Sequence, residues 1–486
     1  MRTQRPNIVF LTWHDAGRWF GGYGCPTVRT PHVDRLAAEG VRFSNHFSAC
    51  AICSPSRAAI MTGTTCQRNG VMTLTNSVFA NRIRPDIPHL AARARGLGYR
   101  TALFGIQHEC AHEHVHEVLR PDECFATDPW ANADLIAHYA RHWLRERERE
   151  DRPFYAQIGT YDAHLNRFYD NRPPLASEPY PPVQDTARGV GVPPYLAGSE
   201  ADRATVATLQ GLLNRGDRLV GAVLDALDEA GLSDRTLVVM CVDHGPGLSR
   251  AKTTCYDAGT GVAWLLRWPG VLPAGRVVDA LCGHVDVLPT IWDLLGQGRP
   301  EPCDGVSLAA HALGRSDAPV REAVFSHMVE NTRSVRTLAH KFIRNVRPPR
   351  WPAGHKGDCA EQHEGFPGDY AKPPAGVVPC PDWPAVELYD LARDPDELRN
   401  LAADPAHAAV RDELDSRLWS FLLDQDDFIV HDPVRTPWQL ATRRDLEAYG
   451  ARVGRAVPAA EGPLADPCDA ASAAGTTAPW PVRRMA

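Results

Sequence analysis

Four apolar runs constrain the fold of this chain more than any other feature of its sequence. They occupy residues 7–13, 99–105, 153–159 and 236–242, and each is followed by polar residues. Runs of this length and composition are typical of strands buried on both faces of a parallel sheet. Long helical patterns at 132–150 and 202–230 lie between successive runs. We therefore predict an α/β fold with a large central, mostly parallel sheet flanked by helices.

Beyond about residue 318 the pattern changes to short alternating runs, which predict an antiparallel sheet with a helix packed on it. A loop rich in proline and glycine interrupts this region at 348–384, and alanine, glycine and proline dominate from about residue 450. We expect a large α/β domain over 1–318 that carries the functional site, a smaller C-terminal α+β subdomain over 319–445 and a low-complexity tail over 446–486.

Charge and hydropathy exclude two classes of protein. The chain has 486 residues and a formal net charge of −7, which argues against a general nucleic-acid binder. No apolar run approaches the length of a membrane span. Residues 1–6 lead directly into the first strand and leave no room for a signal peptide, so we expect a cytoplasmic protein. The sequence leaves open whether the chain forms a homo-oligomer.

The candidate nucleophile is Cys53, which begins a Cys-x-Pro-x-Arg motif. We expect Ser54 to cap a helix that has Pro55 at its first position and stops at Gly63. Cys53 would then stand just outside the helix N-terminus, which attracts anions, with Arg57 one turn along. This arrangement suits a nucleophile that faces an anionic substrate. With 13 cysteines and 41 prolines such a motif arises by chance in about one chain in ten, so a buried structural cysteine is the alternative.

Two further groups of residues suggest redox or metal chemistry. Cys50 and Cys53 form a Cys-x-x-Cys pair, but no second pair completes a zinc site. The histidine-rich tract at 108–114 could also hold zinc, although its spacing matches no established zinc pattern. A single functional histidine at the end of the preceding strand, His108, is the more economical interpretation.

Polar side chains follow the buried strands at the point where each strand ends. Asp15 follows the first strand closely, and Asp243 and His244 come directly after the strand at 236–242. Open α/β sheets place their active sites at the carboxyl ends of their strands, and an Asp-His pair suits a metal ion. A turn with a capping aspartate is the alternative for Asp243. The candidates at this edge are Asp15, His108, His164, Asp243 and His244, and Lys252 follows in a polar loop.

With these residues in view, the chain resembles the type I sulfatases of the alkaline-phosphatase superfamily over nearly its whole length. C-S-P-S-R-A at 53–58 with M-T-G at 61–63 is similar to the signature C-x-P-S-R-A…L-T-G. T-P-H-V-D-R-L-A at 30–37 is similar to the family's T-P-N-L-D-x-L-A. Further similar segments are 7–15, 231–245, 286–290 and 387–401, and the segments at 326–335 and 431–433 resemble the heparan N-sulfatase (sulfamidase) members.

The resemblance implies a formylglycine-dependent hydrolase. In that family the cysteine at the position of Cys53 is oxidised to formylglycine by a separate formylglycine-generating enzyme. One hydroxyl of the hydrated aldehyde, bound to a divalent metal, attacks sulfur while an acid protonates the leaving group, and the second hydroxyl then expels sulfate. The implied activity is release of inorganic sulfate from a small substrate that carries a sulfuric ester or sulfamate, such as a sulfated saccharide.

The resemblance also implies a role for each candidate residue. Four residues would hold the metal, with Ca²⁺ as the first expectation and Mn²⁺ or another ion as the alternative: Asp15, modified Cys53, Asp243 and His244. Three side chains would neutralise the sulfuryl oxygens: Arg57, His108 and Lys252. His164 is the candidate general acid.

Three positions depart from the family pattern. His14 stands where the family often has an aspartate, Ile106 where it has a lysine that contacts sulfate, and Tyr161 where a histidine is more usual. A site with three protein ligands plus formylglycine is closer to that of phosphonate monoester hydrolases. A phosphonate monoester or phosphodiester hydrolase on the same scaffold is therefore the alternative function, and a catalytically degenerate binding protein is a third hypothesis.

Overall fold

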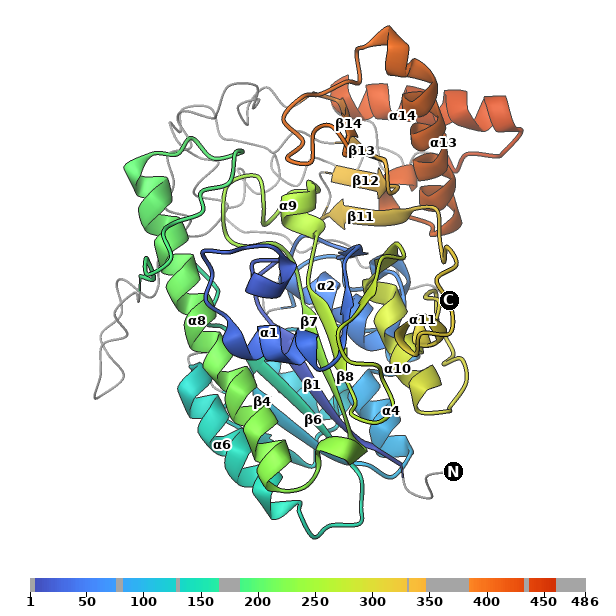
Figure 1. Cartoon of the computed structure of the whole chain (residues 1–486). Helices are drawn as coiled ribbons and strands as arrows, with labels where there is room; N and C mark the ends of the chain where they lie inside the picture. Colours follow the sequence, from blue (N-terminus) through green and yellow to red (C-terminus); the bar gives the residue numbers. More distant parts are fainter. Residues whose placement is uncertain are drawn as a thin grey trace, which may run out of the picture.

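An eight-stranded sheet forms the centre of the computed structural model, which describes residues 5–75, 82–127, 132–165, 184–329, 332–346, 384–431 and 437–459, without the side chains of 437–441. The strand order is β5-β4-β6-β1-β7-β8-β2-β9 (Figure 1). Strand β8 pairs antiparallel with both of its neighbours, and the other pairs are parallel. The strands span Asn7–Trp13 (β1), Val41–Phe43 (β2), Arg100–Gly105 (β4), Glu123–Phe125 (β5), Phe154–Thr160 (β6), Thr236–Val242 (β7), Trp264–Arg267 (β8) and Arg276–Val278 (β9).

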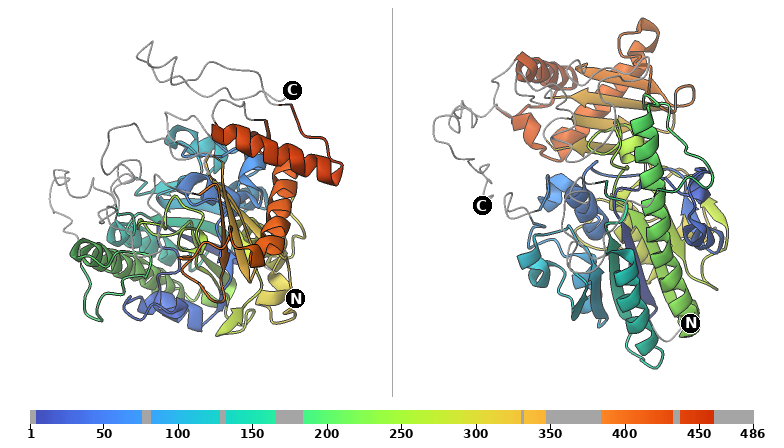
Figure 2. Two further views of the ribbon diagram at one scale, coloured as in Figure 1. Left: turned by 90° about the horizontal axis from the view of Figure 1, so that it is seen from above. Right: turned by 90° about the vertical axis from the view of Figure 1, so that its left-hand side faces the viewer.

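Helices cover both faces of this sheet because its strands are apolar on both sides. In β1, Val9 and Leu11 belong to one hydrophobic core, whereas Ile8 and Phe10 belong to the other. The first core packs against α1, α6 and α8, and the second against α2, α4 and α10 (Figures 1 and 2). These helices span Pro31–Ala38 (α1), Cys53–Thr62 (α2), Leu90–Gly96 (α4), Ala133–Glu146 (α6), Glu200–Glu229 (α8) and Val287–Leu294 (α10). The predicted α/β architecture is confirmed.

A separate antiparallel sheet lies toward the C-terminus, as predicted (Figure 2). Its strands follow the order β11-β12-β13-β14, with bounds Val324–Met328 (β11), Thr332–Arg336 (β12), His340–Asn345 (β13) and Val386–Asp390 (β14). Helix α13 (Ala408–Asp424) packs on this sheet: Leu418 and Leu422 share a core with Val335, Phe342 and Leu388. Helix α14 (Pro437–Val453) follows.

Helix α14 crosses the boundary at which the sequence suggests that the C-terminal tail begins. The sequence rich in alanine, glycine and proline predicts a low-complexity tail from residue 446, whereas α14 continues past this residue to Val453. Leu446 and Tyr449 are buried in the C-terminal core, so these two apolar side chains extend the packed structure past the predicted boundary. The predicted loop at 348–384 lies outside the described residues except for residue 384.

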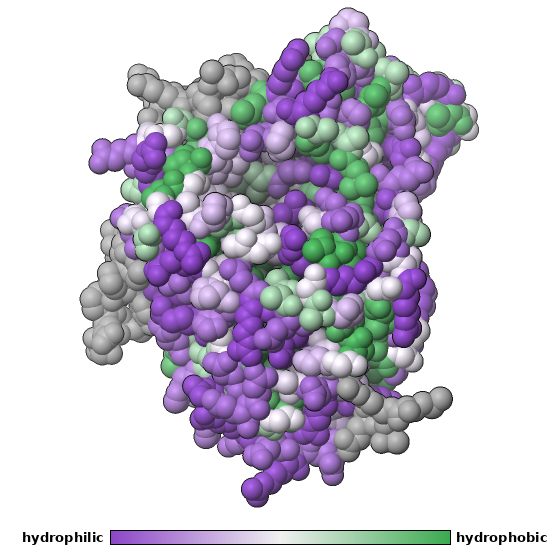
Figure 3. Space-filling view, in the orientation of Figure 1, coloured by the Kyte–Doolittle hydropathy of each residue, from purple (hydrophilic) through white to green (hydrophobic). Residues whose placement is uncertain are grey.

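Hydrophilic residues dominate the face of the molecule seen in Figure 3 over α1 and α8, whose apolar sides pack on the sheet. Within the described ranges no helix combines the length and the apolar character needed to cross a membrane. Shorter elements complete these ranges: β3 (His46–Phe47), β10 (Cys282–Gly283), α3 (Cys66–Asn69), α5 (Val115–Val118), α9 (Asp257–Thr260) and α11 (Ala309–Ala312), with 3-10 turns at Gly21–Tyr23, His112–His114, Ser233–Arg235, His284–Asp286, Pro405–His407 and Phe428–His431.

Candidate active site

The candidate site lies where β1 and β7 end. These strands pair in parallel with Trp13 opposite Val242, so the residues that follow them leave the sheet at the same level. Asp15 adopts a left-handed backbone conformation, with φ of 48°, and its N–H donates to Asp243 Oδ1 at 3.0 Å. This hydrogen bond ties the two strand ends together and compensates for a conformation that is unfavourable for a residue with a Cβ atom.

Helix α2 delivers Cys53 to the same point, but its start differs from the prediction. The helix begins at Cys53 itself, and the N-cap is Ile52, which makes no side-chain capping bond. Ser54 is not the cap, because its hydroxyl accepts a hydrogen bond from the backbone N–H of Thr75 at 3.0 Å instead. The predicted stop is confirmed, since Gly63 ends the helix with φ of 68°. Cys53 therefore lies in the first turn of α2.

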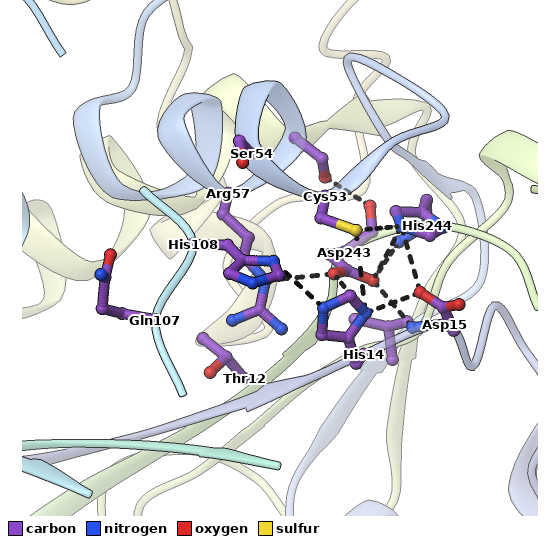
Figure 4. Close-up of polar contacts among 12 residues, drawn as sticks. Thr12, His14, Asp15, Cys53, Ser54, Arg57, Gln107, His108, Asp243 and His244 are labelled. Atoms are coloured by element: carbon purple, nitrogen blue, oxygen red, sulfur yellow. Dashed lines mark hydrogen bonds and ion pairs between the residues drawn. The ribbon is translucent and has the colours of Figure 1, made fainter. Parts of the chain in front are cut away.

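Five side chains meet in a cluster that suits a metal ion. They present one ligand atom each, all within 4.8 Å of one another, and all five residues are buried: His14, Asp15, Cys53, Asp243 and His244 (Figure 4). Cys53 Sγ lies 3.3 Å from His244 Nε2, and His244 Nε2 lies 3.3 Å from Asp15 Oδ1. Two carboxylates, two imidazoles and a fifth donor fit the ligand chemistry of a divalent cation. We call this group the five-residue cluster.

Arg57 supplies a buried positive charge beside the five-residue cluster. Its Nε donates to Asp243 Oδ2 at 3.0 Å, whereas Nη1 and Nη2 are buried and have no hydrogen-bond partner among the described residues. Burial lowers the pKa of Arg57, but the charges of Asp243 and Glu109 outweigh this effect and raise it overall, so the guanidinium keeps its charge. Buried donors without a partner are costly, so these two nitrogens are available to an anionic ligand.

Lys252 and His164 form a second polar contact at the edge of the cluster. Lys252 Nζ lies 2.8 Å from Asp15 Oδ2 and 2.9 Å from His164 Nε2. Burial, and next the charge of Lys252, hold the pKa of His164 well below its usual value. The proton shared between these two side chains therefore resides on Lys252. Both predicted residues reach the site, and their roles stay predictions.

His108 is engaged on both sides of its ring. Its Nε2 lies 2.6 Å from the Tyr161 hydroxyl, and its Nδ1 lies 3.4 Å from His14 Nε2. Ile106 is buried, and Gln107 points away from the cluster and accepts hydrogen bonds from the backbone N–H groups of Glu109 and Cys110 (Figure 4). The protein itself therefore occupies both ring nitrogens of His108, and contact between His108 and sulfate stays a prediction.

Sequence reasoning did not identify Glu109. This carboxyl is buried, accepts hydrogen bonds from Gln157 Nε2 and from the backbone N–H of His108, and supports the charge of Arg57. Burial raises the pKa of Glu109. Its place directly after the candidate residue His108, in the segment that follows β4, is the sequence signal that could have identified it.

The alternative cysteine and zinc hypotheses receive no support. All the cysteines that the structure describes are free, including Cys50 and Cys53. Burial raises the pKa of the Cys53 thiol, so unmodified Cys53 would stay protonated and be a poor nucleophile. Within the described ranges, the tract at 108–114 does not contribute to any group of potential metal ligands.

Comparisons with known proteins agree with this geometry. A model of the family described as Sulfatase matches residues 6–297. The chain is 28% identical over 456 residues to an ulvan-active sulfatase of Formosa agariphila, covering 90% of this chain and 83% of that protein. It is 27% identical over 490 residues to human N-sulphoglucosamine sulphohydrolase, covering 89% and 92%. The solved phosphonate monoester hydrolase of Agrobacterium radiobacter shares the fold, with a TM-score of 0.63 at 21% identity over 87% of this chain and 96% of that one.

Proposed function

The chain belongs to the sulfatase family of sulfuric ester hydrolases, and from that premise we propose that it releases inorganic sulfate from a small sulfated saccharide with Cys53, once converted to formylglycine, as the nucleophile. The observation that carries the proposal is the position of Cys53. Its Sγ lies 3.3 Å from His244 Nε2, inside a buried group of two carboxylates and two imidazoles. A structural cysteine would not need these neighbours.

Different residues of the site would bind the metal ion and the sulfuryl group in this reaction. Asp15, Asp243 and His244 would hold the metal together with the modified residue 53. When bound, the metal would supply Lewis-acid polarisation, and formylglycine would supply the attacking hydroxyl. Arg57 directs two unpartnered donors into the site, which suits the negative oxygens of a sulfuryl group. Burial of the whole group excludes water and strengthens these electrostatic interactions.

The leaving group requires a proton, and two side chains are placed to provide one. Lys252 Nζ donates toward His164 Nε2 at 2.9 Å, and His164 is the more exposed of the two, with 13% of its side chain accessible. We propose that Lys252, which carries the proton, donates it through His164, the group that faces the leaving oxygen or nitrogen.

The substrate class is supported by the relatives. One is named as active on ulvan and another as an N-sulphoglucosamine sulphohydrolase. The net charge of −7 and the buried cationic groups of the site favour a small anionic substrate over a nucleic acid. These relatives support the proposal that this protein hydrolyses O-sulfated or N-sulfated sugars, after maturation by a formylglycine-generating enzyme.

The test is a comparison of substrates with protein matured by a formylglycine-generating enzyme. An aryl sulfate, glucosamine 6-O-sulfate, N-sulfoglucosamine and an aryl phosphonate monoester are each assayed for product release. We expect sulfate release from at least one of the sugars. Faster turnover of the phosphonate would favour the alternative hydrolase, and no turnover of any substrate by protein with verified formylglycine would refute the enzymatic proposal.

Two cysteine variants show whether residue 53 is responsible. Cys53→Ala should lower kcat at least about 10³-fold, as the loss of a nucleophile does in other hydrolases. Cys66→Ala is the matched control, because Cys66 is a buried member of the same hydrophobic cluster but lies outside the five-residue cluster. It should retain kcat. Equal loss in both variants would show a structural effect of the cysteines.

A further inference from the structure

We infer that His14 is itself a metal ligand, through Nδ1, and that it makes this centre select a first-row transition-metal dication over Ca²⁺. The inference rests on the proposed function only in taking the five-residue cluster as the metal centre. It concerns the position where the resemblance leads one to expect an aspartate, and for which no role was assigned above.

The first observation is the direction of one ring nitrogen. His14 is fully buried, and its Nδ1 lies 2.6 Å from Asp15 Oδ1, 3.4 Å from Asp243 Oδ2 and 3.9 Å from Cys53 Sγ. Nδ1 therefore faces the donor atoms of three other members of the cluster at once. Nδ1 thus belongs to the set of potential ligand atoms that all lie within 4.8 Å of one another.

The second observation is what holds the ring in that direction. His14 Nε2 lies 3.4 Å from His108 Nδ1, and His108 Nε2 lies 2.6 Å from the Tyr161 hydroxyl. The ring of Tyr161 also stacks on that of His14, with centroids 4.6 Å apart and planes at 15°. Histidines that bind metals as a rule donate their other N–H to a second residue, which fixes the tautomer.

Ligation through Nδ1 would set the tautomers along this hydrogen-bond chain, because a metal ion needs the Nδ1 lone pair and the ring proton must then sit on Nε2. If His14 Nε2–H donates to His108 Nδ1, then His108 carries its proton on Nε2 and donates it to the Tyr161 hydroxyl. His14 Nδ1 is then left with its lone pair directed into the cluster. Tyr161, which stands where the family more usually has a histidine, would then accept from His108, and its ring stacks on that of His14. The same chain of contacts thus accounts for both His14 and Tyr161, two positions that depart from the family pattern.

The third observation is the resulting set of donor atoms. Ca²⁺ takes six to eight oxygen ligands, whereas imidazole suits Zn²⁺, Fe²⁺, Ni²⁺ and related ions. With His14 included, the four unmodified ligands are two carboxylates and two imidazoles. An aspartate at position 14 would have given three carboxylates and a single imidazole. The replacement therefore exchanges an oxygen donor for a nitrogen donor at a position that is fully buried, where water cannot substitute for it.

The test measures metal binding directly and does not depend on turnover. Matured protein is stripped with chelator, dialysed against equal concentrations of Mn²⁺, Zn²⁺ and Ca²⁺, and analysed by mass spectrometry for bound metal. The same measurement on Cys53→Ala removes any bias of a residual thiol toward Zn²⁺. We expect about one Mn²⁺ or Zn²⁺ per chain and at least about tenfold less Ca²⁺ in both proteins. Predominant Ca²⁺ would overturn the inference, whether or not the enzyme turns over a sulfate.

Variants at position 14 separate ligation from packing. His14→Asp should restore a carboxylate and shift the preference toward Ca²⁺, and His14→Asn should weaken transition-metal affinity by about tenfold or more. His89→Asn is the matched control, because His89 is equally buried but lies outside both groups of potential ligands found among the described residues. It should bind metal like the parent protein. Unchanged metal preference in both position-14 variants would show that His14 is not a ligand.

We also expect a smaller change in metal affinity when Tyr161, the partner of His108, is substituted. Tyr161→Phe keeps the stacked ring and removes the hydroxyl that accepts from His108, so it should weaken metal affinity less than His14→Asn does. If Tyr161→Phe has no effect and His14→Asn does, the ligand assignment stands and the hydrogen-bond chain is not what orients the ring. Metal content unaffected by either change would overturn both parts.

Discussion

Lys252 and Asp15 form a buried ion pair at the edge of the active site. The Nζ–Oδ2 distance is 2.8 Å, and the two side chains are 7% and 0% exposed. Burial raises the pKa of Asp15, but the charge of Lys252, followed by those of the neighbouring histidines, holds it well below its usual value. The same ammonium group lies 2.9 Å from His164. One lysine thus keeps a predicted metal ligand ionised and a predicted acid neutral.

Removing this charge should change both catalysis and its pH dependence. We expect Lys252→Met to lower kcat on the order of 10²-fold, because a preorganised charge next to the reacting group is lost. The positive charge of Lys252 lowers the pKa of His164, so its removal should raise that pKa. His164 would then protonate at higher pH, and the corresponding limb of the pH–rate profile should move to higher pH.

The control for this variant is another buried lysine paired with an aspartate. Lys341 Nζ lies 2.8 Å from Asp257 Oδ1, outside the five-residue cluster. Lys341→Met should reduce stability but leave the shape of the pH–rate profile unchanged. A profile that shifts equally in both variants would mean that Lys252 does not act on His164 specifically.

A buried ion pair joins strand β12 to the segment after α13 and should contribute strongly to the stability of this region. Both Nε and Nη2 of Arg333 lie 2.9 Å from the carboxylate oxygens of Asp427, with side chains 1% and 0% exposed. Arg333→Met would leave the Asp427 carboxylate buried without its partner, which typically costs about 3–5 kcal/mol. The loss is measured as a lower midpoint in denaturant or thermal unfolding.

A surface ion pair provides the comparison. Arg417 Nη1 lies 2.8 Å from Glu322 Oε2, and these side chains are 35% and 81% exposed. Exposed pairs contribute about 0–1 kcal/mol, so Arg417→Met should shift the unfolding midpoint little. Similar shifts of the unfolding midpoint in Arg333→Met and Arg417→Met would contradict the claim that the buried ion pair contributes more to stability than the exposed one.

His89 should make folding stability sensitive to acid. Burial lowers the pKa of His89 to about 3, while an unfolded histidine has a pKa of about 6.5. The unfolded state therefore binds a proton first as the pH falls. The stabilising contribution is complete above pH 6.5 and is lost progressively between about pH 6.5 and 3, which amounts to about 2 kcal/mol for this group at pH 5.

His89→Asn separates this effect from the other titrating groups. His89 Nδ1 accepts from the backbone N–H of Ala91 as the N-cap of α4, and asparagine is also a good N-cap. The variant should therefore keep the helix. Its unfolding should take up about one proton fewer than that of the parent, so its unfolding free energy should fall less steeply as the pH decreases from about 6.5. An identical slope between pH 6.5 and 5 in variant and parent would show that His89 is not the titrating group.

The strands could be predicted because of their burial. The bounds predicted at 7–13 and 236–242 are those of β1 and β7, since a strand covered on both faces is almost entirely apolar. The parallel register then sets Asp15 and Asp243 side by side. For Asp15 and Asp243, the apolar pattern of the strands and their parallel pairing are sufficient to predict that the two side chains lie close together.

Other features depend on contacts that a single sequence does not contain. Serine is a common N-cap residue, but the hydroxyl of Ser54 accepts a hydrogen bond from the backbone N–H of Thr75, which is distant in sequence. The direction of the His14 ring depends on His108 and Tyr161, which follow two other strands. Glu109 supports Arg57 because folding buries both side chains and brings their charges near each other. Each of these requires the three-dimensional packing.

The most direct test of this account is the mass of the peptide that contains residue 53, measured after expression with a formylglycine-generating enzyme. The account predicts the mass of formylglycine at position 53, and Arg57→Ala, which removes the last residue of the Cys-x-Pro-x-Arg motif, should leave cysteine there. An unmodified cysteine in protein that hydrolyses a sulfate ester would contradict the proposed nucleophile.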